Sequence, residues 1–267
     1  MIPSEDNRNQ WVLITGASSG IGETFAKRFA EKNWNTVLVA RSKDKLAQLA
    51  SSFEKQSGQR HLVIAADLLG EKAPEQVYRE VTDHGIELEG LVNNAGVGYG
   101  KQFVDESLEQ VFEMIDLNVK ALVKLTYLFL PSMIARKRGF VLNVSSTASF
   151  QPLPYMAIYG ATKSFVSSFT EALYLETIGT GVRILNFCPG LTKTNFGLRA
   201  GIRDCRLDPF AEEPEQVINT AFRALRGNAP AAVSGLRNQI LVLLERLVPH
   251  RAVLLITLFI QNLRGRI

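Results

Sequence analysis

The chain alternates short apolar, β-branched runs with longer stretches of helical period, and this alternation restricts its fold more than any other feature. The predicted strands are Trp11–Thr15, Thr36–Ala40, His61–Ala66, Leu91–Asn93, Phe140–Val144 and Val182–Phe187. The predicted helices are Gly22–Lys32, Lys43–Gln56, Pro74–His84, Leu108–Arg136, Tyr155–Thr177 and Glu215–Arg226. Strands and helices in this order form a parallel sheet with helices on both faces. We therefore predict a single doubly wound, Rossmann-like α/β domain that binds ligands at the carboxyl ends of its strands.

The composition fits one domain of this kind. The chain has 267 residues, of which 46% are hydrophobic, and this is enough to fill a single core. Its two cysteines, Cys188 and Cys205, are too few for a disulfide framework. The polar N-terminus runs straight into the first strand and leaves no room for a signal peptide. We expect a cytoplasmic protein, with membrane association through the C-terminal end left open.

The net charge of +4 is concentrated at the C-terminal end. Residues 235–267 hold five arginines against the single acid Glu245, whereas the rest of the chain has 25 basic and 25 acidic residues. A neutral body offers no basic face for nucleic acid, so we exclude nucleic-acid binding. The three histidines lie on separate elements without ligand spacing, and we predict no metal site.

A glycine-rich turn follows the first predicted strand and leads into a helix. Its candidate cofactor residues are Gly16, Ser18, Ser19, Gly20, Ile21 and Gly22. Glycines allow a pyrophosphate to approach the backbone N–H groups closely, and the start of the next helix favours negative charge. A glycine-rich turn alone is weak evidence, but its place between strand and helix favours dinucleotide binding.

Arg41 follows the second predicted strand, where a carboxylate would accept hydrogen bonds from the ribose of NAD. A guanidinium can instead pair with a 2′-phosphate, and Ser18 and Ser42 could add hydrogen bonds. We therefore predict that NADP(H) is preferred over NAD(H). The alternative is that Arg41 simply ends a strand in solvent.

Tyr159 and Lys163 are four residues apart on one predicted helix, so their side chains share a face. An ammonium beside a phenol favours the phenolate, and we expect Lys163 to lower the pKa of Tyr159 toward neutrality. Ser146, just past the fifth predicted strand, could hydrogen-bond a substrate oxygen. By itself the Tyr-x-x-x-Lys spacing also fits an amphipathic helix with a solvated lysine.

Together with these motifs, further elements make the chain resemble the short-chain dehydrogenase/reductase family. They are Asn93-Asn94-Ala95-Gly96 after the fourth strand, Asn118 in a long helix, and Pro189-Gly190 after the sixth strand. The resemblance covers about Gln10 to Ala232. Six elements in the family's order are a specific match.

The resemblance implies roles for four catalytic residues. Tyr159 would pass a proton to the substrate oxygen, and Lys163 would lower the pKa of Tyr159 and hold the nicotinamide ribose. The family's serine is the second of a pair, which favours Ser146 over Ser145. Asn118 would position a water in a proton relay, although it also fits a local helix irregularity.

The resemblance also implies further cofactor contacts. They are Asp67, Leu68, Asn93, Ala95, Gly96, Pro189, Gly190, Leu191 and Thr194, in addition to Tyr159 and Lys163. Asp67 would meet the adenine edge, or it caps the following helix. A purely structural role is open for the segment around Asn93.

Two segments lie outside the part that the family shares: one corresponds to a region that varies with substrate, and the other extends beyond the family's common core. Residues 195–214 correspond to the substrate lid. Apolar lid residues that either line a lipophilic pocket or anchor the loop are Phe196, Leu198, Ile202, Leu207 and Phe210. We divide the chain into a catalytic domain, 1–234, and a helical apolar extension, 235–267. The extension suits a partner subunit or flap, a membrane surface, or plain core packing.

These observations predict an NADPH-dependent oxidoreductase that interconverts a carbonyl and an alcohol on a small lipophilic substrate. We expect a homo-oligomer, either a dimer or a tetramer. The alternative is a cofactor-binding regulatory or scaffold protein on the same fold, since fold alone does not fix function.

Overall fold

The computed structural model describes residues 7, 9–202 and 204–263. Seven strands form one parallel sheet in the order β3-β2-β1-β4-β5-β6-β7. The strands are β1 (Trp11–Thr15), β2 (Asn35–Ala40), β3 (His61–Ala65), β4 (Leu88–Asn93), β5 (Gly139–Val144), β6 (Val182–Cys188) and β7 (Ala231–Val233). The order reverses between β1 and β4, which creates the crevice where such sheets bind ligands.

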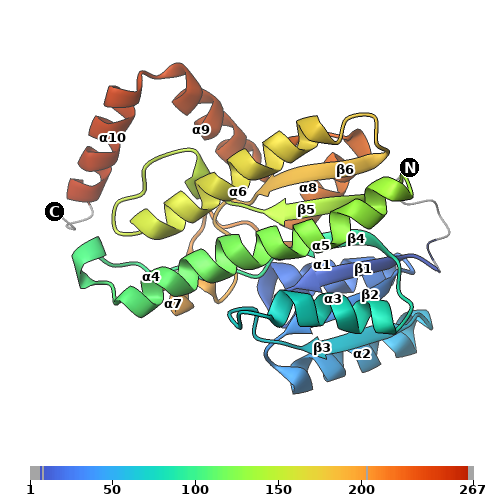
Figure 1. The fold of residues 1–267 in the computed structure, drawn as a ribbon. Helices are drawn as coiled ribbons and strands as arrows, with labels where there is room; N and C mark the ends of the chain where they lie inside the picture. Colours follow the sequence, from blue (N-terminus) through green and yellow to red (C-terminus); the bar gives the residue numbers. More distant parts are fainter. Residues whose placement is uncertain (1–6, 8, 203, 264–267) are drawn as a thin grey trace.

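Helices cover both faces of this sheet, as predicted (Figure 1). The main helices are α1 (Gly20–Glu31), α2 (Lys43–Ser57), α3 (Ala73–Asp83), α5 (Leu122–Ala135), α6 (Ala157–Glu176) and α8 (Pro214–Gly227). The buried apolar residues of α1, α2 and α8 belong to one core cluster, and those of α3 and α5 belong to a second, against which α6 also packs. The doubly wound architecture is thus confirmed.

The central strands are buried on both sides, which explains their unbroken apolar sequences. In β1, Val12 and Ile14 pack into the first cluster and Leu13 packs into the second. Successive side chains of a strand point to opposite faces, so a strand covered on both faces must be apolar throughout.

The long helix predicted for Leu108–Arg136 is interrupted. It consists of α4 (Leu108–Ile115), a π-helical turn (Asp116–Ala121) and α5. By length and composition the stretch Leu108–Ala135 could cross a membrane, but its α5 part is packed into the domain core through residues such as Leu125 and Phe129. A π turn inside an α-helix often marks a functional position.

The C-terminal extension forms α9 (Leu236–Leu247) and α10 (His250–Leu263), which project from the sheet as two arms of a V (Figure 1). Pro249 separates the two helices, because its ring cannot continue α9. The strand before them, β7, was not predicted. Arg264 and Arg266 lie outside the described residues.

One histidine makes the stability depend on pH. Burial lowers the pKa of His61 to about 4 from 6.5, and its Nδ1 bonds Thr36 Oγ1 at 2.9 Å. The unfolded chain binds this proton near pH 6.5 and the folded chain only near pH 4, so stability falls as pH falls through this window. We expect a loss of about 1–2 kcal/mol in the free energy of unfolding, reduced from the full shift because the ring is partly exposed.

Denaturant unfolding at several pH values checks this expectation. In His61→Leu the free energy of unfolding should change less between pH 6.5 and about pH 4 than it does in the wild type. Replacement of the exposed His84 by glutamine should leave this pH dependence unchanged. If the free energy of unfolding depended on pH equally in the wild type and in His61→Leu, other groups would be the cause of the pH dependence.

Candidate active site

A continuous cavity of about 1630 Å³ follows the carboxyl ends of the strands and reaches the C-terminal helices. Ligand pockets commonly enclose about 300–1,000 Å³. The space therefore suffices for a dinucleotide together with a second molecule.

The glycine-rich turn forms one wall of this cavity. Gly16 has a φ of +66°, which residues with a Cβ rarely adopt, and it lets the chain turn from β1 toward α1. Ser18, Ser19, Gly20 and Ile21 also line the cavity. Since the side chain of Ser19 makes no capping hydrogen bond to α1, the first N–H groups of this helix are available to an anion.

Gly22 does not line the cavity but makes the turn compact. A Cβ at this position would lie 2.3 Å from the carbonyl oxygen of Gly16. Its role is therefore close packing of α1 on the turn, which is one of the roles glycines have in such a fingerprint.

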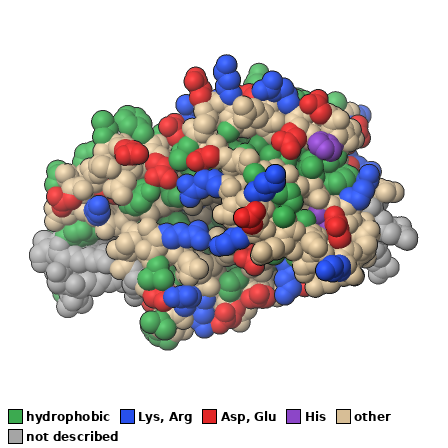
Figure 2. All heavy atoms as spheres, turned by 90° about the horizontal axis from the view of Figure 1, so that it is seen from below, with side chains coloured by type: hydrophobic (Ala, Val, Ile, Leu, Met, Phe, Trp, Pro, Cys, Tyr) green, Lys and Arg blue, Asp and Glu red, His purple; other side chains and the backbone are tan. Residues whose placement is uncertain are grey.

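Two basic side chains from the segment after β2 line the cavity in addition to the glycine-rich turn. Arg41, Ser42 and Lys45 line the same cavity as Ser18, and Lys45 lies in the first turn of α2, four residues after Arg41. Figure 2 shows a hollow in one face of the molecule with Lys and Arg side chains on its margins. The position of Lys45, four residues after Arg41, was a signal that our sequence analysis missed.

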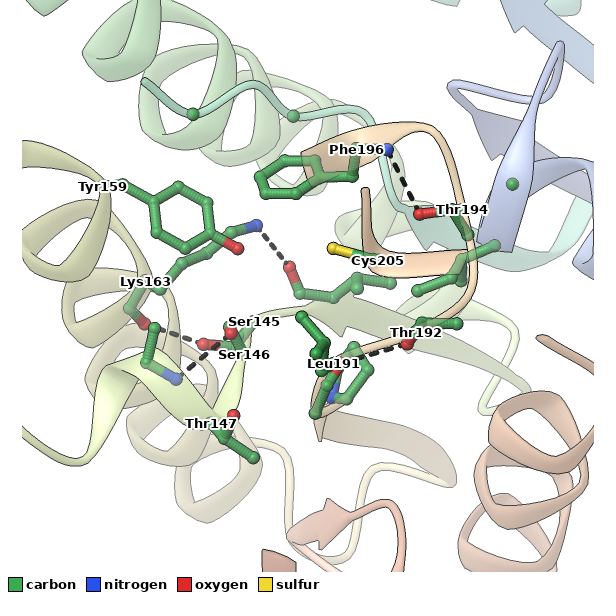
Figure 3. A pocket seen from close by; sticks show the side chains of 18 of the residues that line it. Ser145, Ser146, Thr147, Tyr159, Lys163, Leu191, Thr192, Thr194, Phe196 and Cys205 are labelled. Atoms are coloured by element: carbon green, nitrogen blue, oxygen red, sulfur yellow. Dashed lines mark hydrogen bonds between the residues drawn. The ribbon is translucent and has the colours of Figure 1, made fainter. Parts of the chain in front are cut away.

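Ser146, Tyr159 and Lys163 come together on the cavity wall (Figure 3). Tyr159 and Lys163 project from the first turns of α6, and Ser146 follows β5. The Lys163 ammonium donates to the carbonyl oxygen of Val144 at 2.9 Å and lies 5.8 Å from the centre of the Tyr159 ring.

Burial governs the ionisation of this group. It raises the pKa of Tyr159 to about 12, opposed by a hydrogen bond with Ser146, and lowers the pKa of Lys163 to about 8. The expected shift of Tyr159 toward neutrality is therefore not found in this structure. The reason is that desolvation outweighs the hydrogen bond with Ser146, while the Lys163 ammonium is directed at a backbone carbonyl. At pH 7 the phenol holds its proton and can donate it.

Ser145 and Asn118 hold the backbone that carries Tyr159 and Lys163. The Ser145 hydroxyl donates to the carbonyl oxygen of Lys163 at 2.8 Å, so it fixes α6 although it also borders the cavity. Asn118, buried in the π turn, donates to Val97 O and Thr162 Oγ1 and accepts from Val97 N. Asn118 does not line the cavity, so it acts on the site through the loop and α6.

The two neighbouring asparagines at the end of β4 have different roles. Asn93 is buried and donates to Thr126 and Asn143, away from the cavity. Asn94 lines the cavity and its amide donates to the carbonyl oxygen of Thr15 at 2.9 Å. Sequence reasoning named Asn93, whereas Asn94 is the residue that braces the glycine-rich turn.

The remaining candidate cofactor residues all line the cavity. They are Asp67, Leu68, Ala95, Gly96, Pro189, Gly190, Leu191 and Thr194. Asp67 also accepts a hydrogen bond from the N–H of Leu69 at 3.2 Å within its own loop, but it does not cap α3, whose N-cap residue is Lys72. Thr194 approaches Gly20 and accepts from the N–H of Phe196.

The apolar residues of segment 195–214, the predicted lid, divide into lining and exposed residues. Phe196, Ile202 and Phe210 line the cavity, and the Phe196 ring lies 5.5 Å from that of Tyr159. Leu198 and Leu207 do not line it and are 50% and 82% exposed. This segment therefore presents an aromatic surface beside Tyr159.

The described part of the chain gives no indication of a metal site, and the thiol of Cys188 is not activated. No group of three His, Cys, Asp or Glu side chains there could hold a metal ion. Burial raises the pKa of Cys188 to about 11, so this thiol stays protonated at neutral pH.

The family model for short chain dehydrogenase matches residues 10–201 of this chain. The chain is 36% identical over 185 residues to very-long-chain 3-oxoacyl-CoA reductase of Anas platyrhynchos, an alignment that covers 67% of this chain and 58% of the relative. It is 38% identical over 189 residues to sulfoacetaldehyde reductase 2 of Chromohalobacter salexigens, covering 70% of this chain and 74% of that protein.

Solved structures share the fold. A short-chain dehydrogenase from Sphingobium yanoikuyae in complex with NADPH superposes with a TM-score of 0.80 at 33% identity, covering 84% of this chain and 87% of the other. The bulky-bulky ketone specific alcohol dehydrogenase from Comamonas testosteroni gives 0.77 at 28% identity, covering 97% and 95%. The second match extends over nearly the whole chain.

Proposed function

Because the chain belongs to the short-chain dehydrogenase family, we propose that it is an NADPH-dependent reductase that interconverts a lipophilic carbonyl compound and its alcohol. The meeting of Ser146, Tyr159 and Lys163 on the wall of a cavity that also holds the glycine-rich turn carries this proposal. A protein that only bound the cofactor would have no use for a proton donor at that place.

Each catalytic side chain has a task that follows from its environment. Tyr159, protonated at pH 7, donates its proton to the substrate oxygen, and Ser146 hydrogen-bonds the same oxygen. Lys163, with a pKa of about 8, is mostly charged at pH 7 and stabilises the phenolate that Tyr159 leaves behind. Asn118 holds the π turn and the loop at Val97 in place.

The residues present fit a nicotinamide dinucleotide. The open start of α1 and the glycine-rich turn suit its diphosphate, and Arg41 with Ser18, Ser42 and Lys45 suits a 2′-phosphate. When bound, this cofactor supplies the hydride for the carbonyl carbon. Lys163 and Thr194 border the space for its nicotinamide half.

Replacing Arg41 by alanine should reduce the preference for NADPH over NADH. Loss of a charge-assisted hydrogen bond to the 2′-phosphate should weaken NADPH use about ten- to a hundredfold and leave NADH use nearly unchanged. Steady-state kcat/KM with each cofactor measures the effect. Lys43→Ala is the matched control, since this lysine is exposed and does not line the cavity. A wild type that uses both cofactors equally well would contradict the role of Arg41.

The part of the cavity that we assign to the substrate is largely apolar. Leu153, Met156, Phe196 and Phe210 line it, together with residues of α9 and α10. Such a surface favours a long or bulky aliphatic carbonyl over a small polar one. The test is NADPH oxidation with ketones, aldehydes and 3-oxoacyl thioesters of increasing chain length, for which we expect kcat/KM to rise with length. Faster turnover of short polar carbonyls would contradict this substrate class.

A further inference from the structure

The two C-terminal helices carry apolar residues on both their inner and outer faces. The apolar inner residues that line the cavity are Leu241, Val242, Leu244 and Val248 near α9 and Val253 and Ile256 on α10, and the polar ones are Arg237, Asn238, Glu245 and Thr257. This side of the extension therefore forms a wall of the active-site cavity. A helix in solvent would be polar on its opposite side.

The opposite side of both helices is instead apolar and exposed. We call the outer face the eight large residues that do not line the cavity: Leu236, Ile240, Leu243, Leu247, Leu254, Leu255, Leu258 and Phe259. On α9 they repeat at intervals of four, three and four residues, which aligns them in one stripe. Leu236 and Leu247 are 72% and 73% exposed, and Leu255 and Phe259 of α10 are 65% and 63% exposed. Exposed apolar residues gathered in this way mark an interaction site.

The extension is fixed to the catalytic domain at its base. Ser234, just before α9, donates to Glu212 at 2.6 Å and accepts from the N–H of Gly190 in the cofactor loop. Asn238 in the first turn of α9 bonds Glu212 and the carbonyl oxygen of Ser234. The outer face therefore keeps a defined orientation relative to the active site.

Charge identifies the partner of the outer face. The extension carries five arginines and one glutamate. Among the described arginines, Arg237 and Arg246 lie over the rings of Phe210 and Phe150, and Arg251 is exposed at the start of α10. In a twofold contact with a second copy, this positive segment would face itself and repel. Anionic lipid headgroups would instead complement it, and apolar helices flanked by arginine are typical of a membrane surface.

We propose that the outer face docks on an anionic membrane surface, so that the cavity takes its carbonyl substrate from the bilayer. The substrate part of this proposal rests on the proposed reductase function, and the docking part stands independently of it. Because α9 and α10 lie between the outer face and the cavity, docking places the cavity wall next to the lipid. A lipophilic substrate in the bilayer then lies one layer of helices away from the cavity.

Vesicle sedimentation of the full-length protein tests docking without any enzyme assay. We expect binding to phosphatidylcholine vesicles that contain phosphatidylglycerol, weaker binding without it, and release as salt rises, since exposed charges are screened within about 10 Å at 0.1 M salt. In Leu243→Glu/Leu247→Glu the binding should fall at least tenfold, because both charges lie on the outer face. The control is Leu175→Glu/Ile178→Glu near the end of α6, which adds the same charge at residues that are 67% and 66% exposed.

Each outcome decides the docking proposal. Vesicle binding lost only in the α9 variant supports it, whereas absence of wild-type binding or equal loss in the control overturns it. A dimer in light scattering that the α9 variant dissociates, without vesicle binding, would assign the outer face to a second copy. The α9 variant should still reduce a water-soluble carbonyl. If the wild type bound vesicles but reduced nothing, the reductase function would fail while docking stood.

Discussion

Tyr159→Phe should lower kcat about 10²–10⁴-fold while the affinity for NADPH stays within about twofold of wild type. The phenylalanine ring keeps the packing against Phe196 but has no proton to give. Single-turnover kinetics and cofactor titration by fluorescence measure the two quantities separately.

Tyr155→Phe is the matched control for this substitution. Tyr155 lies four residues earlier and does not line the cavity, so removing its hydroxyl should leave turnover nearly unchanged. Turnover of Tyr159→Phe near the wild-type rate would show that another group donates the proton.

Lys163→Ala should lower kcat/KM about 10²–10³-fold through both kcat and cofactor binding, because the ammonium stabilises developing negative charge on Tyr159 and borders the cofactor space. In the wild type the rate of carbonyl reduction should also fall as pH rises through about 8, where Lys163 loses its proton, while Tyr159 remains protonated up to about pH 12.

The exposed Lys27 on α1 provides the control, and Lys27→Ala should match the wild type. Unchanged NADPH affinity in Lys163→Ala would contradict a role in cofactor binding. A reduction rate that stays level across pH 8 in the wild type would contradict the role of the lysine charge.

The strand and helix pattern could be predicted because burial on both faces leaves a strong apolar signal. Six of the strands were located within three residues at each end. The missed strand, β7, has only three residues and exists through its pairing with the end of β6, a tertiary contact that local sequence does not encode.

Two site details depended on contacts that no local pattern contains. Asn93 and Asn94 have identical chemistry, and only the alternation of the strand decides which of them turns toward Thr15 and the glycine-rich turn. The π turn at Asn118 breaks an otherwise helical sequence, and its asparagine is held by bonds to Val97 and Thr162, which are distant in sequence.

The ionisation of Tyr159 required the structure for a similar reason. The spacing to Lys163 placed the two side chains on one face, as predicted, but burial raises the pKa of the phenol to about 12. How deeply α6 is covered follows from the packing of the whole domain, which the spacing of two residues does not reveal.

The proposal that this chain is a reductase is tested most directly by the stoichiometry of one reaction. Purified protein is incubated with NADPH and a long-chain ketone, and the alcohol formed is quantified by mass spectrometry beside the NADPH consumed. We expect equimolar alcohol and oxidised cofactor over many turnovers. Tight binding of NADPH without any alcohol, across the series of carbonyl compounds, would contradict the account and would indicate a cofactor-binding regulatory protein instead.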